Sequence, residues 1–383
     1  MPRGPMVHDF VVIGAGIAGA SIAYELARSG SVCLIEAESR PGFHATSRSA
    51  ALFAPSYGGA EIRALTRASR RFFDQPPSTF CDYGLLAPRG CLYIARADQS
   101  ARLRRMVESI RSSGGSVGII GVEEAMARVP LIRAEYLAAA ASDCDAMDID
   151  VESLHQGFLR GARRAGATLI TGTKAIRIER RAQVWSIDLD DATVTAPVLV
   201  NAAGAWADEL AEACGARRIG LQALRRTALL IDAPAGADIR RWPAVIDADE
   251  AFYFKPEGAQ LLLSPADEIP QPPGDAHPEE LDIAIGVDRV QAALHIEVRR
   301  VSRSWAGLRT FSPDRVPVVG FDPQVEGLFW CAGQGGYGIQ TAPALARTAA
   351  ALAKHETLPA DIAAEGLTAA VLSPHRFLAV TAD

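Results

Sequence analysis

The sequence has no arrangement of cysteines or histidines that would hold a structural metal ion or a disulfide framework. Its six cysteines include no C-x-x-C pair, and its seven histidines form no H-x-x-x-H spacing. Structural zinc sites draw their ligands from closely spaced pairs of this kind. We therefore expect a reduced, cytoplasmic protein without a metal site. A peripheral position at the inner face of a membrane is the alternative location.

Long apolar runs and an excess of positive charge are also missing. The longest hydrophobic stretches fall well short of the roughly 18 residues of a membrane-spanning helix. The net charge of -6 disfavours nucleic acid as a partner. The first apolar strand begins so early that we expect no signal peptide before it. These absences favour a soluble globular protein, and 383 residues are enough for two domains.

The dominant feature that is present is the stretch from His8 to Glu36. The apolar run 10–13 has the pattern of a buried parallel strand. Gly14, Gly16 and Gly19 follow it as G-x-G-x-x-G. The first glycine permits the turn, the second lets a pyrophosphate approach the backbone, and the third lets helix and strand pack closely. A helix and a second strand complete a dinucleotide-binding unit.

The ends of this unit predict how a dinucleotide would bind. The helix that starts at Ile17 and Ala18 directs free N–H groups and a partial positive charge at the phosphates. Glu36, 22 residues after Gly14, and the adjacent Ala37 close the second strand. A carboxylate at this place accepts both ribose hydroxyls and would repel the 2′-phosphate of NADP. The stretch alone does not distinguish FAD from NAD.

Two later segments suggest that the cofactor domain is discontinuous. A buried strand near residue 200 leads into a turn of small residues, and the segment 328–341 reads as strand, glycine-rich turn and helix. Sheet-rich segments lie between them. We expect an α/β protein with a cofactor domain formed by residues 1–80, 145–220 and 310–383. Residues 81–144 and 221–309 would form a second domain with an antiparallel sheet.

Two segments after the first unit leave alternatives open. The stretch 43–51, rich in small and hydroxyl residues, either donates hydrogen bonds to a cofactor or forms an ordinary loop. Tyr57, in a stretch with a proline and a glycine pair, is either a lid residue or a packed loop tyrosine.

Several strings in order along nearly the whole chain resemble the FAD-dependent D-amino acid oxidase and glycine oxidase (DAO) family. They read VIGAGIAGAS, HATSRSAA, RALTRASRRFFDQPP, LHQGFLRG, VLVNAAGAW, AFYFKP, SWAGLRTF and QGGYGIQT. Within this family the likeness is greatest to bacterial D-arginine dehydrogenases. The resemblance implies a two-domain flavoprotein fold, with a Rossmann-like FAD domain and an antiparallel-sheet substrate domain. It favours FAD over NAD.

The resemblance also implies site residues. Arg226 and Arg309 match the positions that grip a substrate carboxylate, and an arginine fork binds a carboxylate by two parallel charge-assisted bonds. Tyr253 matches a tyrosine that reaches the same carboxylate, and Tyr57 matches one on a loop that closes over the substrate. Two further positions, Gly336 and Gln340, match residues near the substrate amine.

Other matching positions would line the cofactor. Together with the residues of the first unit (Gly14, Gly16, Ile17, Ala18, Gly19, Glu36 and Ala37), the implied cofactor contacts are Ser47, Arg48, Ser49, Ala51, Ala175, Ala203, Gly204, Trp206, Gly335, Tyr337, Gly338, Ile339, Gln340 and Thr341. Sarcosine-type relatives tether their flavin through a cysteine before the S/T-P-D motif. The equivalent stretch 305–314 has no cysteine here, so we expect non-covalent FAD.

The implied reaction is oxidation of a D-amino acid at Cα by hydride transfer to flavin N5, giving an imino acid that hydrolyses to a 2-oxo acid and ammonia. The side-chain pocket departs from the D-arginine dehydrogenase pattern, because Cys91 replaces its glutamate and Leu52 its histidine. Ala244 and Ile246 would line the same side. We therefore expect apolar or uncharged side chains to be preferred over D-arginine.

The resemblance favours a quinone-like electron acceptor over oxygen. Two other functions remain open at this point. One is a glycine- or sarcosine-type amine oxidase that releases hydrogen peroxide. The other is a flavin- or metabolite-binding protein without catalysis.

Overall fold

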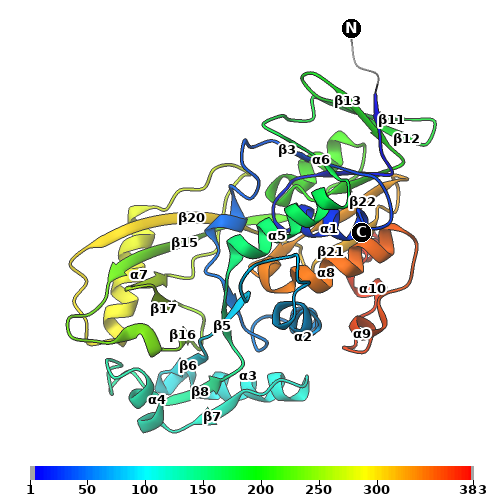
Figure 1. The fold of residues 1–383 in the computed structure, drawn as a ribbon. Helices are drawn as coiled ribbons and strands as arrows, with labels where there is room; N and C mark the ends of the chain where they lie inside the picture. Colours follow the sequence, from blue (N-terminus) through cyan, green and yellow to red (C-terminus); the bar gives the residue numbers. More distant parts are fainter. Residues whose placement is uncertain (1–4, 381–383) are drawn as a thin grey trace.

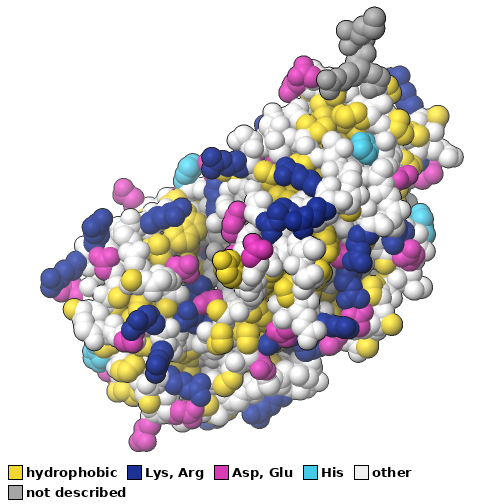
Figure 2. Space-filling view, in the orientation of Figure 1, with side chains coloured by type: hydrophobic (Ala, Val, Ile, Leu, Met, Phe, Trp, Pro, Cys, Tyr) yellow, Lys and Arg dark blue, Asp and Glu magenta, His cyan; other side chains and the backbone are white. Residues whose placement is uncertain are grey.

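The computed structural model describes residues 5–380, which form two large sheets joined by smaller elements (Figure 1). No helix within that range is long and apolar enough to cross a membrane. Lysine and arginine side chains lie among aspartates and glutamates on the face shown in Figure 2.

The first sheet has six strands and contains the predicted dinucleotide unit. In order across the sheet, its strands are β10 (Thr168–Thr171), β3 (Val32–Glu36), β2 (Phe10–Ile13), β14 (Val198–Asn201), β22 (Leu328–Ala332) and β21 (Val318–Phe321). All neighbours are parallel except β21, which runs antiparallel to β22. The carboxyl ends of the parallel strands, which come from three distant parts of the chain, therefore lie along one edge of the sheet. Ligands of α/β sheets bind at this edge.

Helices and a small sheet cover the two faces of this sheet. One apolar core joins it to α1 (Ile17–Leu26), α2 (Ala60–Asp74), α5 (Val151–Arg164) and α8 (Gly338–Ala353). Asp150 caps α5 by accepting a hydrogen bond from the Ser153 N–H at 2.8 Å. The other face packs on α6 (Ala207–Ala213) and on the sheet β1 (Met6–Val7), β13 (Thr193–Ala196), β12 (Val184–Asp188) and β11 (Arg177–Arg181).

The second sheet has ten strands and lies beside the first (Figure 1). Its main path is β23 (Gln334–Gly335), β20 (Val301–Phe311), β15 (Gln222–Asp232), β18 (Gln260–Ser264), β17 (Tyr253–Glu257), β16 (Ala244–Asp247), β6 (Cys91–Ala95), β8 (Ala139–Asp143) and β7 (Gly118–Ile120). The short strand β19 (Ile269–Pro270) also pairs with β15. All pairs are antiparallel except β16 with β6.

One face of the ten-stranded sheet is covered and the other faces the cofactor segments. α7 (Glu280–Ala293) packs on β15 and β18, and α4 (Val122–Arg128) joins the same core. On the other face, α3 (Ser100–Ser112) packs on β6 and β8, in one apolar cluster with Leu52, Cys91 and Ala244. The 3-10 helix η1 (Ala45–Arg48) contacts β20, and a small sheet is formed by β4 (Leu52–Phe53), β9 (Met147–Ile149) and β5 (Leu86–Pro88).

Short helices complete the described chain. They are η2 (Ala97–Gln99), η3 (Gly204–Trp206), η4 (Ile239–Arg241), α9 (Ala360–Ala363), α10 (Ala369–Leu372) and η5 (Pro374–Val380). The mixed architecture of a Rossmann-like sheet and a largely antiparallel sheet confirms the predicted fold class.

Candidate active site

The glycine turn after β2 has the close packing that the sequence predicts. Gly14 has a φ of +98°, and a Cβ atom there would lie 2.4 Å from the carbonyl oxygen of Ala202. A Cβ atom at Gly19 would lie 1.7 Å from the carbonyl oxygen of Gly14. Any side chain at either position would push the first helix away from its sheet. The cradle expected for a dinucleotide phosphate is therefore present.

The start of α1 and the end of β3 meet at this cradle. The carboxylate of Glu36 accepts hydrogen bonds from the Ala15 N–H at 2.7 Å and the Glu38 N–H at 3.0 Å. The Ile17 N–H donates to the hydroxyl of Thr46 at 2.9 Å. No acidic residue lies in the first turn of α1. The arrangement leaves a helix N-terminus suited to a phosphate and a carboxylate placed for a ribose, so the residues fit FAD.

The segments near residues 175 and 204 lie at the same edge of the sheet. β10 pairs with β3 so that Thr171 lies opposite Glu36. Three residues before Ala175, the Gly172 N–H donates to the carbonyl oxygen of Glu38 at 2.9 Å. After β14, Ala203 and Gly204 begin η3, and the ring of Trp206 packs on His44 with centroids 4.8 Å apart. The fold thus brings segments with predicted cofactor contacts to one edge of the sheet.

The segment 47–51 is anchored to the ten-stranded sheet. Arg48 donates to the carbonyl oxygens of Ala276 at 2.9 Å and Ala306 at 2.8 Å. Ser49 accepts a hydrogen bond from the Ala51 N–H at 3.0 Å, and Ala51 has a φ of +59°. A left-handed conformation costs energy for alanine and is concentrated at functional sites. This geometry supports a positioned cofactor segment more than an ordinary loop.

The glycine-rich turn 335–341 completes the cofactor segments. β23 pairs with the end of β20, and Tyr337 and Gly338 start α8. The amide of Gln340 is buried, accepting from the Ala54 N–H at 3.1 Å and donating to Thr66 at 3.0 Å. Thr341 donates to the carbonyl oxygen of Tyr337 at 2.9 Å. The side chains of Gln340 and Thr341 therefore hold this segment in place.

A small pocket of about 70 Å³ lies between these segments and the ten-stranded sheet. Its lining combines cofactor residues with the predicted substrate residues. The lining residues are Ser49, Ala50, Ala51, Leu52, Tyr57, Arg226, Ala244, Ile246, Glu250, Tyr253, Lys255, Ala266, Arg309, Gly336, Ile339 and Gln340. All six residues expected at the substrate carboxylate and amine line this one pocket.

The two arginines share a sheet face because of the register of β15 and β20. Arg226 lies opposite Gly307, and Arg309 lies opposite Leu224, two positions along. Arg226 is 8% exposed, and its buried Nε has no hydrogen-bond partner among the described residues. Burial, and then the charge of Arg309, lower the pKa of Arg226. The buried Arg226, with its unsatisfied donor, and the half-buried Arg309 form a site for an anion such as a carboxylate.

Two tyrosines close the same region. Tyr253 begins β17, and Tyr57 lies in the loop after β4. The ring of Tyr57 packs edge-on against Tyr337 with centroids 5.2 Å apart, and its hydroxyl lies 3.5 Å from a carboxylate oxygen of Glu250. Burial raises the pKa of Tyr57, so its hydroxyl keeps the proton that it would donate to a carboxylate.

The predicted side-chain pocket is only partly assembled as expected. Leu52, Ala244 and Ile246 line the pocket, but Cys91 does not. Cys91 lies opposite Ala244 on the neighbouring strand β6 and is 1% exposed. Burial raises the pKa of its thiol. Cys91 therefore lies on the same sheet face as Ala244, one strand away, in an apolar cluster with Leu52, Ala244 and Ile246.

Three charged residues at this site are not evident from sequence reasoning. Lys255 lines the pocket and pairs with Asp148 at 2.8 Å and Glu257 at 3.0 Å. Glu250 lies at the pocket near Tyr57. The Lys255 position falls within the string AFYFKP, two residues after Tyr253, so its alternation along a strand could have indicated it.

The third charged residue is Glu268, in the loop after β18. Its carboxylate accepts from Arg226 at 3.1 Å and from Arg315 at 2.6 Å. Nothing in the sequence pattern connects Glu268 with Arg226. Within residues 5–380, no group of histidine, cysteine and acidic side chains is arranged to hold a metal ion.

Comparison with known proteins agrees with this geometry. Residues 9–352 match the family model described as DAO, FAD dependent oxidoreductase. The chain is 25% identical to hydrogen cyanide synthase subunit HcnC of Pseudomonas aeruginosa, over 93% of this chain and 94% of that protein. It is also 25% identical to glycine oxidase of Geobacillus kaustophilus, over 94% of this chain and 97% of that protein.

Solved structures show the same fold. The glycine oxidase of Geobacillus kaustophilus superposes with a TM-score of 0.81 at 23% identity, covering 95% of this chain and 99% of that one. L-proline dehydrogenase from P. horikoshii has a TM-score of 0.81 at 22% identity, with 97% and 98% covered. The cradle, the clustered cofactor segments and the family match together establish that this chain belongs to the DAO family of FAD-dependent oxidoreductases.

Proposed function

We infer that the protein oxidises D-amino acids with apolar or uncharged side chains to imino acids, as a dehydrogenase with non-covalent FAD. The observation that carries this proposal is the grouping of Arg226, Arg309 and Tyr253 around one pocket that also contains Gly336. The D configuration rests on the resemblance to D-arginine dehydrogenases that we infer from the sequence strings. The family match supports the reaction class.

The substrate carboxylate would bind to the two arginines and the hydroxyl of Tyr253. Charge-assisted bonds of this kind contribute about 1.5 to 3 kcal/mol each. The hydroxyl of Tyr57 would donate a hydrogen bond to the same carboxylate when its loop packs over the substrate. The carbonyl oxygen of Gly336 would accept a hydrogen bond from the substrate amine. These contacts orient the amino acid and exclude water from its Cα.

When bound, FAD supplies the two-electron acceptor for the hydride that leaves Cα. The substrate amine must be neutral, because an ammonium group has no lone pair to form the C=N bond as the hydride leaves. The pocket lining contains no histidine, and its one carboxylate, Glu250, lies 3.5 Å from the Tyr57 hydroxyl, so we propose that the amine proton passes to water. The imino acid then hydrolyses to a 2-oxo acid and ammonia outside the pocket.

The charges in the pocket support a preference against cationic substrates. Besides the two arginines, the pocket contains the ammonium group of Lys255, and its nearest carboxylates, Asp148 and Glu257, already pair with it. Leu52, Ala244 and Ile246 supply an apolar wall. Among the residues that line the pocket, a basic substrate side chain would find one carboxylate, Glu250. The same lining contains three cationic side chains, those of Arg226, Arg309 and Lys255.

A substrate panel tests this proposal. Purified holoenzyme is mixed under argon with D- and L-amino acids, and bleaching of the flavin absorbance is followed. We expect bleaching by D-alanine, D-valine or D-leucine and little by their L forms. The proposal would be contradicted if D-arginine had the highest kcat/KM of all the amino acids tested. It would also be contradicted if only the L-amino acids bleached the flavin.

A glycine- or sarcosine-type amine oxidase is the second candidate function. The small volume of the pocket, about 70 Å³, favours it, as does the 25% identity to glycine oxidase. A peroxide assay with glycine, sarcosine and D-alanine distinguishes the two, because a dehydrogenase would need a quinone or dye.

For the dehydrogenase we propose a quinone acceptor and a cytoplasmic location, with peripheral membrane contact as the alternative.

A further inference from the structure

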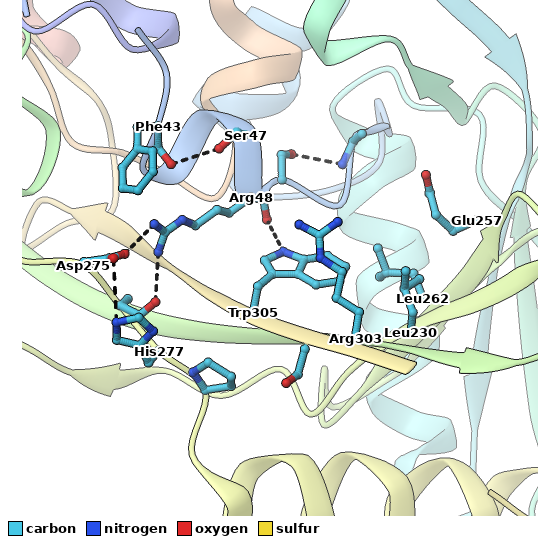
Figure 3. A pocket seen from close by; sticks show the side chains of 15 residues that line it. Phe43, Ser47, Arg48, Leu230, Glu257, Leu262, Asp275, His277, Arg303 and Trp305 are labelled. Carbon is cyan, nitrogen blue, oxygen red and sulfur yellow. Dashed lines mark hydrogen bonds and ion pairs between the residues drawn. The ribbon is translucent and has the colours of Figure 1, made fainter. Parts of the chain in front are cut away.

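The structure contains a second, larger cavity of about 500 Å³ (Figure 3), and its lining includes four of the predicted cofactor residues, Ser47, Arg48, Ser49 and Ala51. Leu230 lies opposite Arg303 across β15 and β20, just as Arg226 lies opposite Gly307. Paired residues spaced by an even number of positions share one face of a sheet. Leu230 and Arg303 therefore line the cavity on the sheet face that carries the substrate arginine, further along the two strands.

The two cavities share one wall and little else. Ser49 and Ala51 line both of them, whereas Arg226, Arg309 and Gly336 line only the substrate pocket. The shared residues belong to the segment that is predicted to lie along the flavin. A molecule in the second cavity would thus approach the cofactor segment while an amino acid or its product occupied the substrate pocket.

The lining of the second cavity suits a flat aromatic molecule. The guanidinium of Arg303 lies 5.4 Å from the ring centroid of Trp305, and that of Arg48 lies 5.3 Å from the ring of Phe43. The indole N–H of Trp305 donates to the carbonyl oxygen of Arg48 at 3.2 Å, which fixes the orientation of the ring. Figure 3 shows these side chains around one space. Leu230 and Leu262 add apolar surface.

The charges of the lining favour an uncharged ligand with hydrogen-bond acceptors. Arg48 pairs with Asp275, and Glu257 pairs with Lys255 at 3.0 Å. Among the ion pairs within residues 5–380, none involves Arg303. Its guanidinium can donate to a carbonyl oxygen of the ligand. A quinone has this combination of a flat ring, no charge and two carbonyl acceptors.

We propose that this cavity binds the quinone that reoxidises the enzyme. The proposal rests on the proposed function, because it assigns a place to that function's electron acceptor. In the step, the reduced cofactor gives two electrons and one proton to the quinone, and water supplies the second proton. The quinone becomes a quinol, and FAD returns to its oxidised form.

Binding of menadione to the holoenzyme, measured by titration calorimetry, tests the site without turnover. Leu230→Trp fills the cavity, and we expect it to abolish saturable binding. Arg303→Met removes the proposed donor and should weaken binding about tenfold, the effect of losing one hydrogen bond to a charged group. Arg300→Met removes an exposed arginine nearby in the chain and outside the cavity, and should bind like wild type. Wild-type affinity in both cavity variants would overturn the proposal.

Rapid mixing then separates the two halves of the reaction. We expect Leu230→Trp and Arg303→Met to be reduced by a D-amino acid at the wild-type rate but to be reoxidised by menadione at least tenfold more slowly. Equal slowing of both halves would assign the cavity to the cofactor or substrate and refute the acceptor site. Reduction by dithionite gives an independent route. If no D-amino acid bleaches the flavin but the dithionite-reduced variants reoxidise slowly, the proposed substrate is wrong and the acceptor site stands.

Discussion

The position of Gly336 beside Arg309 allows a sharp test of carboxylate binding. A Cβ atom at Gly336 would lie 2.7 Å from Nη1, 2.9 Å from Cζ and 3.0 Å from Nε of Arg309. Cβ atoms in proteins essentially never lie closer than 3.0 Å to a non-bonded heavy atom, so the guanidinium would have to move. The backbone of Gly336 does not have a positive φ, so alanine is compatible with its conformation. The Gly336→Ala side chain should therefore displace the guanidinium and leave the fold intact.

The expected cost follows from the bonds that the displaced guanidinium would lose. Loss of one charge-assisted hydrogen bond to the substrate carboxylate corresponds to about 1.5 to 3 kcal/mol, or about a ten- to 150-fold weaker affinity. The assay is the dissociation constant of benzoate, followed by the perturbation of the flavin spectrum. Benzamide has the same ring without the negative charge, and its binding should change much less.

Gly121→Ala is the matched control for Gly336→Ala. A Cβ atom at Gly121 would meet nothing within 4 Å, so this variant should keep the wild-type affinity and stability. FAD content should be the same in both variants, because the contact at Gly336 is with Arg309. An unchanged benzoate affinity in Gly336→Ala, with full FAD content, would refute the placement of the carboxylate at Arg309.

Three further predictions concern other charged groups. Arg226→Met should lower kcat/KM by about thirty- to a thousandfold, equivalent to about 2 to 4 kcal/mol, because a desolvated carboxylate would lose its partner, and an effect no larger than in Arg300→Met would argue against this role. Glu268→Gln should strengthen benzoate binding about two- to fivefold, because Glu268 competes for Arg226 but is 33% exposed and thus screened; weaker binding would show that Glu268 instead holds Arg226 in place. Burial raises the pKa of Asp143, so the folded state binds its proton more tightly than the unfolded state, and stability falls as pH rises from about 4 towards the raised pKa. Asp143→Asn should flatten this decline in urea unfolding curves, and an unchanged slope would assign the pH dependence to other groups.

Much of the fold was accessible from local patterns, because they encode local constraints. The glycine spacing predicts the turn, since only a residue without a side chain fits against the carbonyl oxygen of Ala202. The strand 10–13 and the helix that starts at Ile17 are likewise formed as predicted. The division into two domains with the stated boundaries and the roles of the individual site residues stay predictions.

The sequence by itself determined the dinucleotide cradle and the residue types of the anion site, because turn geometry and residue chemistry are properties of short segments. Only the tertiary structure decided which side chains meet. Strand pairing puts Cys91 beside Ala244, one strand away from the pocket lining, and a loop brings Glu268 to Arg226 across a long separation in sequence. Lys255 and Arg303 likewise acquire their places from the register of the ten-stranded sheet. Such register is set by the packing of whole sheets, so no local pattern contains it.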